Sequence, residues 1–246
     1  DEDDKKIIEI LKDRNTIILL NKSDLADARV NQEWENFFKE KGYFVQPLNA
    51  KTGAGIKNIQ ALVQESCKEK IERDRKRGII NRPVRAMVVG IPNVGKSTFI
   101  NSFAGKACAK TGNKPGVTKG KQWIRLNKNL ELLDTPGILW PKFEDQKIGE
   151  RLALIGSIND EILHVDELAV ALIQNLKNSY LDLLEKRYDI TIDEDAYDTL
   201  KKVAIARKCL QKGELPDVDR ASSMLLEDFR SGKLGRITLE HPEEWK

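Results

Sequence analysis

The sequence predicts an α/β fold, a mostly parallel sheet with an antiparallel edge strand, followed by an all-α C-terminal domain. Short apolar runs alternate with amphipathic helical segments, which is typical of a parallel sheet with covering helices; the runs are 16–20, 43–48 and 85–89, and the helical segments are 31–41 and 56–76. After Pro141 only helical periodicity remains. We therefore expect two domains, residues 1–142 and 143–246.

Weaker signals complete the expected order of elements. A helix is expected at 5–13 and another from Lys96, whereas Asn127-Lys128-Asn129 is a turn signal that predicts an antiparallel strand pair, 122–126 with 130–133. The helical periodicity of the second domain recurs at 145–155, 163–177, 193–210 and 217–231.

Composition indicates a globular protein rather than a membrane or disordered one. Of the 246 residues 40% are hydrophobic and 33% charged, and the formal net charge is +3. No apolar run approaches the roughly 20 residues that span a bilayer, and no signal peptide opens the chain, so we expect a cytoplasmic protein with no membrane partner. Cys67, Cys108 and Cys209 are odd in number and far apart, which favours reduced thiols. The chain lacks an initiator Met, and we expect sequence to be missing upstream.

A phosphate-binding loop is predicted at Gly90–Ser97, Gly-Ile-Pro-Asn-Val-Gly-Lys-Ser, called the P-loop below. It follows an expected strand and opens an expected helix, so backbone N–H groups at the helix N-terminus can surround an anionic phosphate. Lys96 would reach the terminal phosphates and the Ser97 hydroxyl would bind Mg²⁺.

Two further groups are expected at the same site. Asp134, in Asp-Thr-Pro-Gly, follows the strand 130–133, and its carboxylate can hold Mg²⁺ while the Gly137 N–H meets the γ-phosphate. Thr118, in the long polar loop after the P-loop helix, is the candidate for a second hydroxyl ligand of Mg²⁺.

Guanine selection is predicted from Asn21-Lys22-Ser23-Asp24, the first base loop, which directly follows an apolar strand. The Asp24 carboxylate can accept two hydrogen bonds from the N1–H and exocyclic amine of guanine, a donor pair that adenine lacks. Lys22 would lie along the base, and Asn21 would either donate to the base or tie the loops together. After the next strand comes Asn49-Ala50-Lys51, the second base loop, whose Ala50 N–H could bond guanine O6.

The residues expected to hold the nucleotide share a position after a strand or at the start of the P-loop helix. They are Asn21, Lys22, Ser23, Asp24, Asn49, Ala50, Lys51, Asn93, Val94, Gly95, Lys96, Ser97, Thr98 and Gly137.

These motifs, with the base loops ahead of the P-loop, resemble a circularly permuted GTPase. Together with Pro115-Gly-Val-Thr-Lys, the stretch from Asp134 to Glu144 and Lys233-Leu-Gly-Arg, they resemble the ribosome biogenesis GTPase A family over nearly the whole chain. The resemblance implies a bacterial factor that binds the precursor of the large ribosomal subunit late in assembly and leaves on GTP hydrolysis. It implies GTP or GDP, Mg²⁺ and K⁺ as cofactors.

One departure from the family pattern concerns the front of the chain. The segment with a Trp-Phe-Pro-Gly-His-Met-like motif and the strand ending in Asp-Ala-Arg are absent, so the sheet should lack one strand. The resemblance places a catalytic histidine in that segment and gives Asn93 a role in binding K⁺. Within this chain Lys96, Thr118 and Gly137 would contribute to catalysis.

Hydrolysis by this chain is expected to be slow. A Ras-like glutamine that positions water is replaced by Ile138, which cannot orient a water molecule. His164 and His241 have no motif around them, and we interpret them as surface or packing residues. The resemblance implies stimulation by the ribosome and by K⁺.

Basic residues cluster in three places, and each cluster allows ribosomal RNA contact or a solvated charged surface. The last of these clusters, on the C-terminal helices, has near-helical spacing, and the resemblance favours RNA binding there. The clusters are Lys68, Lys70, Arg73, Arg75, Lys76, Arg77, Arg82 and Arg85; Lys106, Lys110, Lys114, Lys119 and Lys121; and Lys201, Lys202, Arg207, Lys208 and Lys212.

Two interpretations of function remain open from the sequence. One is a GTP-hydrolysing assembly factor on the ribosome, and the other is a nucleotide-gated module that binds a protein or a different RNA. An ATP-using enzyme is disfavoured by Asp24. We expect a monomer with no DNA partner.

Overall fold

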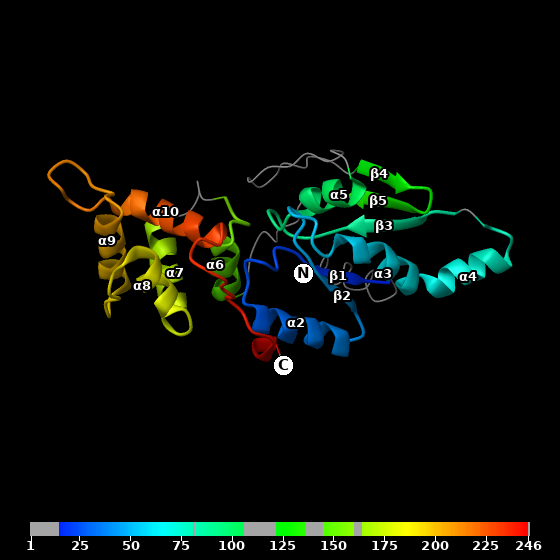
Figure 1. The fold of residues 1–246 in the computed structure, drawn as a ribbon, viewed down its shortest axis with the longest axis horizontal. Coiled ribbons are helices and arrows are strands. Elements are labelled where there is room, and N and C mark those ends of the chain that lie inside the picture. Colours follow the sequence, from blue (N-terminus) through cyan, green and yellow to red (C-terminus); the bar gives the residue numbers. More distant parts are fainter. Residues whose placement is uncertain (1–14, 81, 106–121, 136–144, 160–163, 246) are drawn as a thin grey trace.

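The computed structural model describes residues 15–80, 82–105, 122–135, 145–159 and 164–245 (Figure 1). An α/β part runs up to Thr135, and a helical part begins at Asp145 and lies beside it. The helix expected at 5–13 and nearly all of the loop expected between 105 and 120 lie outside the described residues.

The α/β part contains the alternating elements that the sequence predicts. They are β1 (Ile17–Leu20), α2 (Ala28–Glu40), β2 (Phe44–Pro47), the 3₁₀ turn η1 (Ile56–Asn58), α3 (Ile59–Ser66), α4 (Lys68–Lys76), β3 (Val84–Val88), α5 (Lys96–Ala104), β4 (Gln122–Asn127) and β5 (Leu130–Asp134). Asp27 caps α2, because its carboxylate accepts a hydrogen bond from Arg29 N at 2.8 Å. The helix therefore begins three residues before its expected start at residue 31.

The described strands form two sheets rather than the single sheet expected. β1 pairs with β2 in parallel, and a second sheet has the order β3-β5-β4, with β3 and β5 parallel and β4 antiparallel at the edge. Among the described strands, β1 and β3 each keep one edge without a strand partner.

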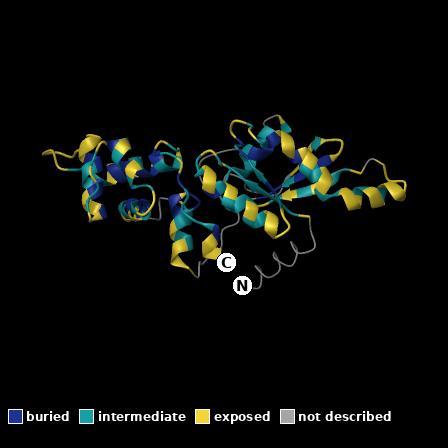
Figure 2. Ribbon diagram, turned by 60° about the horizontal axis from the view of Figure 1, so that its bottom comes forward, coloured by how far each residue is buried: buried dark blue, intermediate teal, exposed yellow. Residues whose placement is uncertain are grey.

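The long helix expected at 56–76 is divided in the structure. Cys67 leaves the helical conformation (φ −101°, ψ 9°) and separates α3 from α4. Ile59 of α3 is buried in the core of the α/β part, whereas α4 has no buried residue (Figure 2). Because no packing face continues past Cys67, nothing holds the second helix in line with the first.

The helical part contains α6 (Gln146–Leu154), α7 (Val165–Lys177), α8 (Leu181–Tyr188), α9 (Ala196–Ala206), α10 (Val218–Arg230) and the 3₁₀ turn η3 (Pro242–Trp245). Its buried apolar residues form a cluster distinct from that of the α/β part. Sequence periodicity missed α8, an eight-residue helix with only Leu184 and Tyr188 buried. Among the described residues, no helix is both long and apolar enough to cross a membrane.

The last residues return to the α/β part and fasten it to the helical part. Ile237 N donates to Leu25 O at 2.9 Å, and the indole N–H of Trp34 on α2 donates to Glu240 O at 3.0 Å. Arg151 of α6 pairs with the carboxylates of Glu240 and Glu244 at 3.2 and 2.6 Å. The C-terminal tail therefore contacts α2, α6 and the segment after β1.

A buried carboxylate, Asp228 of α10, organises one side of the helical part. It is 3% exposed, and it accepts hydrogen bonds from Arg187 Nε at 2.9 Å and from the Tyr188 hydroxyl at 3.1 Å. Burial acts to raise the pKa of Asp228, but the hydrogen bonds from Arg187 and Tyr188 and the charge of Arg187 outweigh it and lower this pKa. Asp228 thus stays ionised and joins α8 to α10.

Replacing this carboxylate by an amide, Asp228→Asn, should lower the free energy of unfolding by about 2 kcal/mol at neutral pH, since hydrogen bonds to charged groups are the stronger ones. The folded-state pKa lies below the ordinary 3.8, so the stabilisation is present above 3.8 and is lost as the pH falls through the folded value. Urea unfolding of the wild type and the variant, from neutral pH to below 3.8, measures this difference in the free energy of unfolding.

The matched control is Asp182→Asn, which alters an exposed carboxylate paired with Lys186 at 2.9 Å and should change stability little. A cost of Asp228→Asn that stays constant down to strongly acidic pH would contradict the assignment.

Candidate functional site

The predicted site residues follow the C-terminal ends of four strands. The first base loop follows β1, the second follows β2, the P-loop follows β3, and Asp134 ends β5. Because β1 and β2 are parallel, as are β3 and β5, each sheet brings two of these segments to the same edge.

The amide of Asn21 joins the two base loops to the P-loop. Its Nδ2 donates to Val94 O at 2.7 Å, and its Oδ1 accepts from Ala50 N at 3.0 Å. Gly95 takes a left-handed conformation (φ 92°), and a Cβ at this position would collide with Nδ2 of Asn21. Of the two roles predicted for Asn21, the structure thus places it in the one that ties the loops together.

Ala50 joins the second base loop to the first. Its N–H donates to Asn21 Oδ1 in this structure, and its bond to guanine O6 stays a prediction. Asn49 orders the same loop, since its Oδ1 accepts from Lys51 N at 2.9 Å and from Thr52 N at 3.0 Å. The second base loop is therefore held in shape by side-chain amides.

Lys22 and Ser23, which follow Asn21 in the first base loop, also contact other segments of the site. Lys22 Nζ donates to Asn93 O at 2.9 Å, while Ser23 donates to Leu48 O from both its backbone N (3.2 Å) and its hydroxyl (3.1 Å). Asp24 is exposed. Burial of the ammonium and the positive charge of Arg230 lower the pKa of Lys22, and Asp24 acts in the opposite direction. The Asp24 carboxylate is thus left accessible for a base.

The P-loop leads directly into α5. Ser97 and Thr98 lie in the first turn of α5, where backbone N–H groups have no helical partner. Lys96 Nζ donates to Gly90 O and Ile91 O, both at 2.8 Å, so the ammonium lies over the loop. Burial lowers the pKa of Lys96, and the nearby Asp134 carboxylate opposes this shift.

Asp134 is a buried carboxylate near the P-loop lysine. It is 2% exposed, and its Oδ1 has no hydrogen-bond partner in the described part of the chain. Burial raises the pKa of Asp134, opposed by the charge of Lys96 and by the backbone N–H of Thr135. A buried carboxylate oxygen without a partner, on the strand beside the P-loop, fits a Mg²⁺ ligand.

Two predicted site residues lie outside the described residues: Thr118 and Gly137. Thr135, which precedes Gly137 in the chain, is described, and its hydroxyl donates to Val88 O at 2.7 Å. This bond fixes the end of β5 against the end of β3, which sets Asp134 beside the P-loop.

Comparison with known proteins agrees with this geometry. The protein named ribosome biogenesis GTPase A from Bacillus cereus is 45% identical over 240 residues, covering 97% of this chain and 81% of that protein. The chain belongs to the ribosome biogenesis GTPase A family. The profile of the family described as 50S ribosome-binding GTPase matches residues 85–197, and the two base loops precede this match.

Solved structures share the fold of this GTPase family member. A GDP-bound structure of TM YlqF aligns with a TM-score of 0.63 at 28% identity, covering 93% of this chain and 84% of that one. A GNP-bound YlqF from T. maritima aligns with a TM-score of 0.61 at 25% identity, covering 99% of both chains.

Sequence reasoning missed the contacts by which the helical part of this GTPase holds the P-loop. Asn93, in a left-handed conformation (φ 59°), donates from Nδ2 to Gly156 O, and the Ser157 hydroxyl donates to Pro92 O at 2.9 Å. Arg230 of α10 donates to Ala153 O and Leu154 O at 2.7 and 2.8 Å. A Gly-Ser pair after a helix is an ordinary end signal, so no motif indicated this role.

The unpartnered Asp134 carboxylate predicts a stability that depends on pH. With a raised folded-state pKa, Asp134 stabilises the fold below the ordinary value of 3.8, and this contribution is lost as the pH rises through the folded value. Without nucleotide, Asp134→Asn should therefore raise the melting temperature at neutral pH by about 2–4 °C. Differential scanning fluorimetry should show this gain disappearing below pH 3.8.

Adding Mg²⁺ and GDP should reverse the order, because the carboxylate of the wild type then gains a partner. Asp189→Asn is the control, since Asp189 is exposed and in a left-handed conformation that asparagine also adopts. Asp134→Asn with a lower melting temperature than the wild type at neutral pH, without nucleotide, would refute this account.

Proposed function

We propose that this chain binds and hydrolyses GTP in late assembly of the bacterial large ribosomal subunit, in the cytoplasm. The observation that carries the proposal is the Asn21 amide, which joins both base loops to the P-loop in a member of the ribosome biogenesis GTPase A family. A guanine-recognising carboxylate, Asp24, and a phosphate loop then belong to one site.

The proposed roles follow the positions of the side chains. Asp24 selects guanine, with Asn21, Lys22, Ser23 and the second base loop shaping the base site. The P-loop from Asn93 to Thr98 binds the phosphates, and Lys96 offsets their charge. The roles of Thr118 and Gly137 rest on the sequence pattern alone.

Magnesium fits the donors at this site. Ser97 and Asp134, with Thr118 from the polar loop, would hold Mg²⁺, which supplies charge stabilisation to the β- and γ-phosphate oxygens when bound. The buried Oδ1 of Asp134 supports the assignment, because this oxygen has no other partner among the described residues.

The helical part is proposed to be a separate RNA-binding domain, residues 143–246, that joins the G domain, residues 1–142. Some of its basic residues already have partners: Lys201 pairs with Asp198, Lys202 with Asp193, and Arg207 lies over the Tyr188 ring. Lys208 and Lys212 are exposed and complete the surface proposed to contact ribosomal RNA. We propose that the protein acts as a monomer.

Nucleotide-dependent binding to the ribosome tests the function. Co-sedimentation with immature large subunits should be strong with a non-hydrolysable GTP analogue and several-fold weaker with GDP, because the helical part contacts Pro92 and Asn93 of the P-loop. Equal co-sedimentation in both states would argue against a release cycle driven by GTP hydrolysis.

Asp24→Asn provides an internal control for this measurement. An amide at this position donates where xanthine offers a carbonyl oxygen, so the variant should respond to an XTP analogue and no longer to the GTP analogue. A variant that still responds to the GTP analogue would contradict the assignment of Asp24 to the base.

Potassium is proposed to assist hydrolysis through Asn93, whose side-chain oxygen is a ligand type that alkali cations accept. Single-turnover hydrolysis by this chain should be slow, and faster in K⁺ than in Na⁺ at equal ionic strength, because the bound cation offsets phosphate charge. Equal and rapid rates in both salts would exclude this role.

A further inference from the structure

A groove at the opposite end of β3 from the P-loop has no part in the nucleotide site. It encloses about 360 Å³ between α3, α4, residues 79–80 and 82–84, and the turn between β4 and β5. Val84 and Leu130, which begin β3 and β5, line it, whereas the nucleotide loops follow the other ends of these strands. The cavity is called the α4 groove below, and its lining residues lie within 60–80, 82–84 and 129–130.

The floor of the α4 groove is aliphatic and partly open to solvent. Ile71 of α4, Leu130 and the pair Ile79 and Ile80 line it, and the two isoleucines are 40% and 78% exposed. Adjacent exposed isoleucines in the lining of a cavity are unusual for a surface segment that only connects two elements. The floor therefore offers an apolar surface to a bound group.

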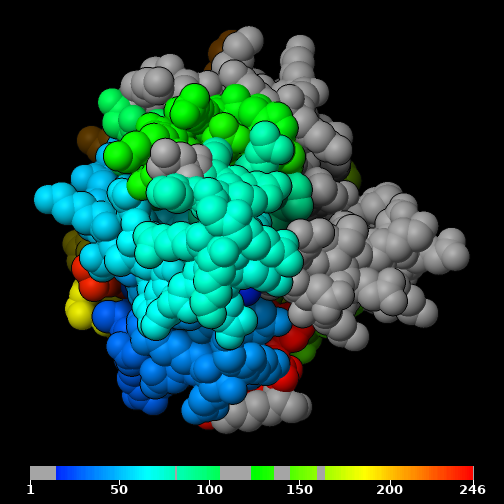
Figure 3. Space-filling model, turned by 90° about the vertical axis from the view of Figure 1, so that its right-hand side faces the viewer, coloured from blue at the N-terminus to red at the C-terminus, as the bar shows by residue number. Residues whose placement is uncertain are grey.

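The rim of the α4 groove has more basic than acidic side chains. Four basic residues line it, Lys68, Lys70, Arg75 and Arg82, against the two acidic residues Glu72 and Asp74. Lys70, Arg75 and Arg82 of the rim form no ion pair with any described residue. Figure 3 views the molecule from this end, where residues 68–80 stand at the front.

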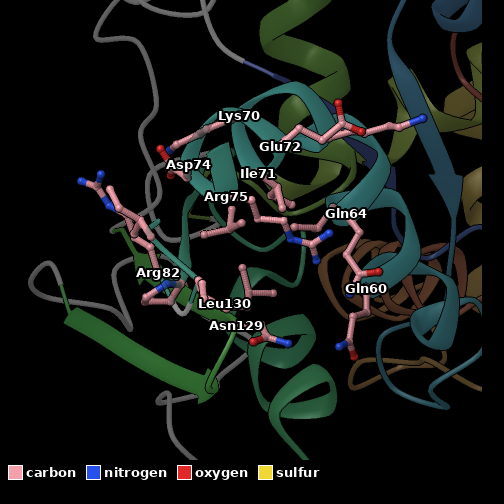
Figure 4. A pocket seen from close by; sticks show the side chains of 16 residues that line it. Gln60, Gln64, Lys70, Ile71, Glu72, Asp74, Arg75, Arg82, Asn129 and Leu130 are labelled. Atoms are coloured by element: carbon pink, nitrogen blue, oxygen red, sulfur yellow. The ribbon is translucent and has the colours of Figure 1, made fainter. Parts of the chain in front are cut away.

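Amide side chains complete the lining. Gln60 and Gln64 of α3 and Asn129 of the β4–β5 turn surround the aliphatic floor, with Arg75 beside it and Arg82 on the far side (Figure 4). Side-chain amides both donate and accept, so they match the mixed polar edges of nucleobases. The volume lies within the range of about 300–1,000 Å³ that holds small organic groups.

We propose that the α4 groove binds a single-stranded RNA segment, with one base against the isoleucines, its edge on the amides, and the flanking phosphates on the Lys and Arg rim. Unpaired bases are reached in this way, whereas bases in a duplex are not. The guanidinium of Arg75 can stack on the base. The excess of basic residues favours RNA over a peptide. This inference rests on the proposed ribosomal RNA partner.

Fluorescence anisotropy with the 246-residue chain tests the proposal, using a labelled RNA of about 12 nucleotides as a single strand and as a duplex. Replacing the exposed apolar pair, Ile79→Ser with Ile80→Ser, should weaken single-strand binding about fivefold or more and leave duplex binding unchanged. Because both side chains are exposed, the fold and the affinity for a GTP analogue should not change.

A second variant tests the rim. Arg75→Gln with Arg82→Gln should reduce the salt dependence of binding, lowering the slope of log Kobs against log salt by about 0.7 for each phosphate that the rim no longer neutralises. The matched control, Arg29→Gln with Lys39→Gln, removes the same charge from α2 and should leave the slope as in the wild type.

Five results would overturn the proposal. The serine variant could weaken single-strand and duplex binding equally, the α2 control could weaken binding as much as the rim variant, or an oligoglutamate peptide could compete as well as unlabelled RNA. If the wild type binds RNA and no groove variant alters this binding, the α4 groove is not the binding site, although an RNA partner is still supported. A wild type that binds no RNA would overturn both.

Discussion

The nucleotide site depends on the side-chain amide of Asn21. It spans 73 residues to Val94 and 29 residues to Ala50, and it uses its donor and its acceptor at once. A carboxylate could not donate to the Val94 carbonyl, and a lysine could not accept from the Ala50 N–H. Replacing this amide would therefore remove the bonds that hold loops from two separate sheets in register.

The helical part adds a second level of organisation to the same loops. It contacts the P-loop through Gly156 and Ser157, and its C-terminal tail contacts Leu25 just after the first base loop. The P-loop and the segment after the first base loop are therefore both linked to the helical part. By thermodynamic linkage, a partner and a nucleotide that both discriminate between positions of the helical part would change each other's affinity by the same factor.

The sequence predicted the parts of the site that local pattern determines. The P-loop, the base loops and Asp134 were found because strands and helix starts leave local signals around them. The contact of Ala50 with Asn21 was not foreseen, because the reach of the Asn21 side chain depends on tertiary packing. The same reason explains why the division of the sheet, the break at Cys67 and the contacts of Ser157 were not foreseen. α8 was not predicted, because two buried apolar residues in an eight-residue helix are too few to show a periodicity.

The two-sheet arrangement has a mechanical consequence. One sheet carries the segments that would hold the base, and the other carries those that would hold the phosphates. A guanine nucleotide carries its base at one end and its phosphates at the other. A bound nucleotide would therefore connect the sheet that contains β1 to the sheet that contains β3. The ligand would then help to hold the two sheets together, and part of its binding free energy would stabilise the folded domain.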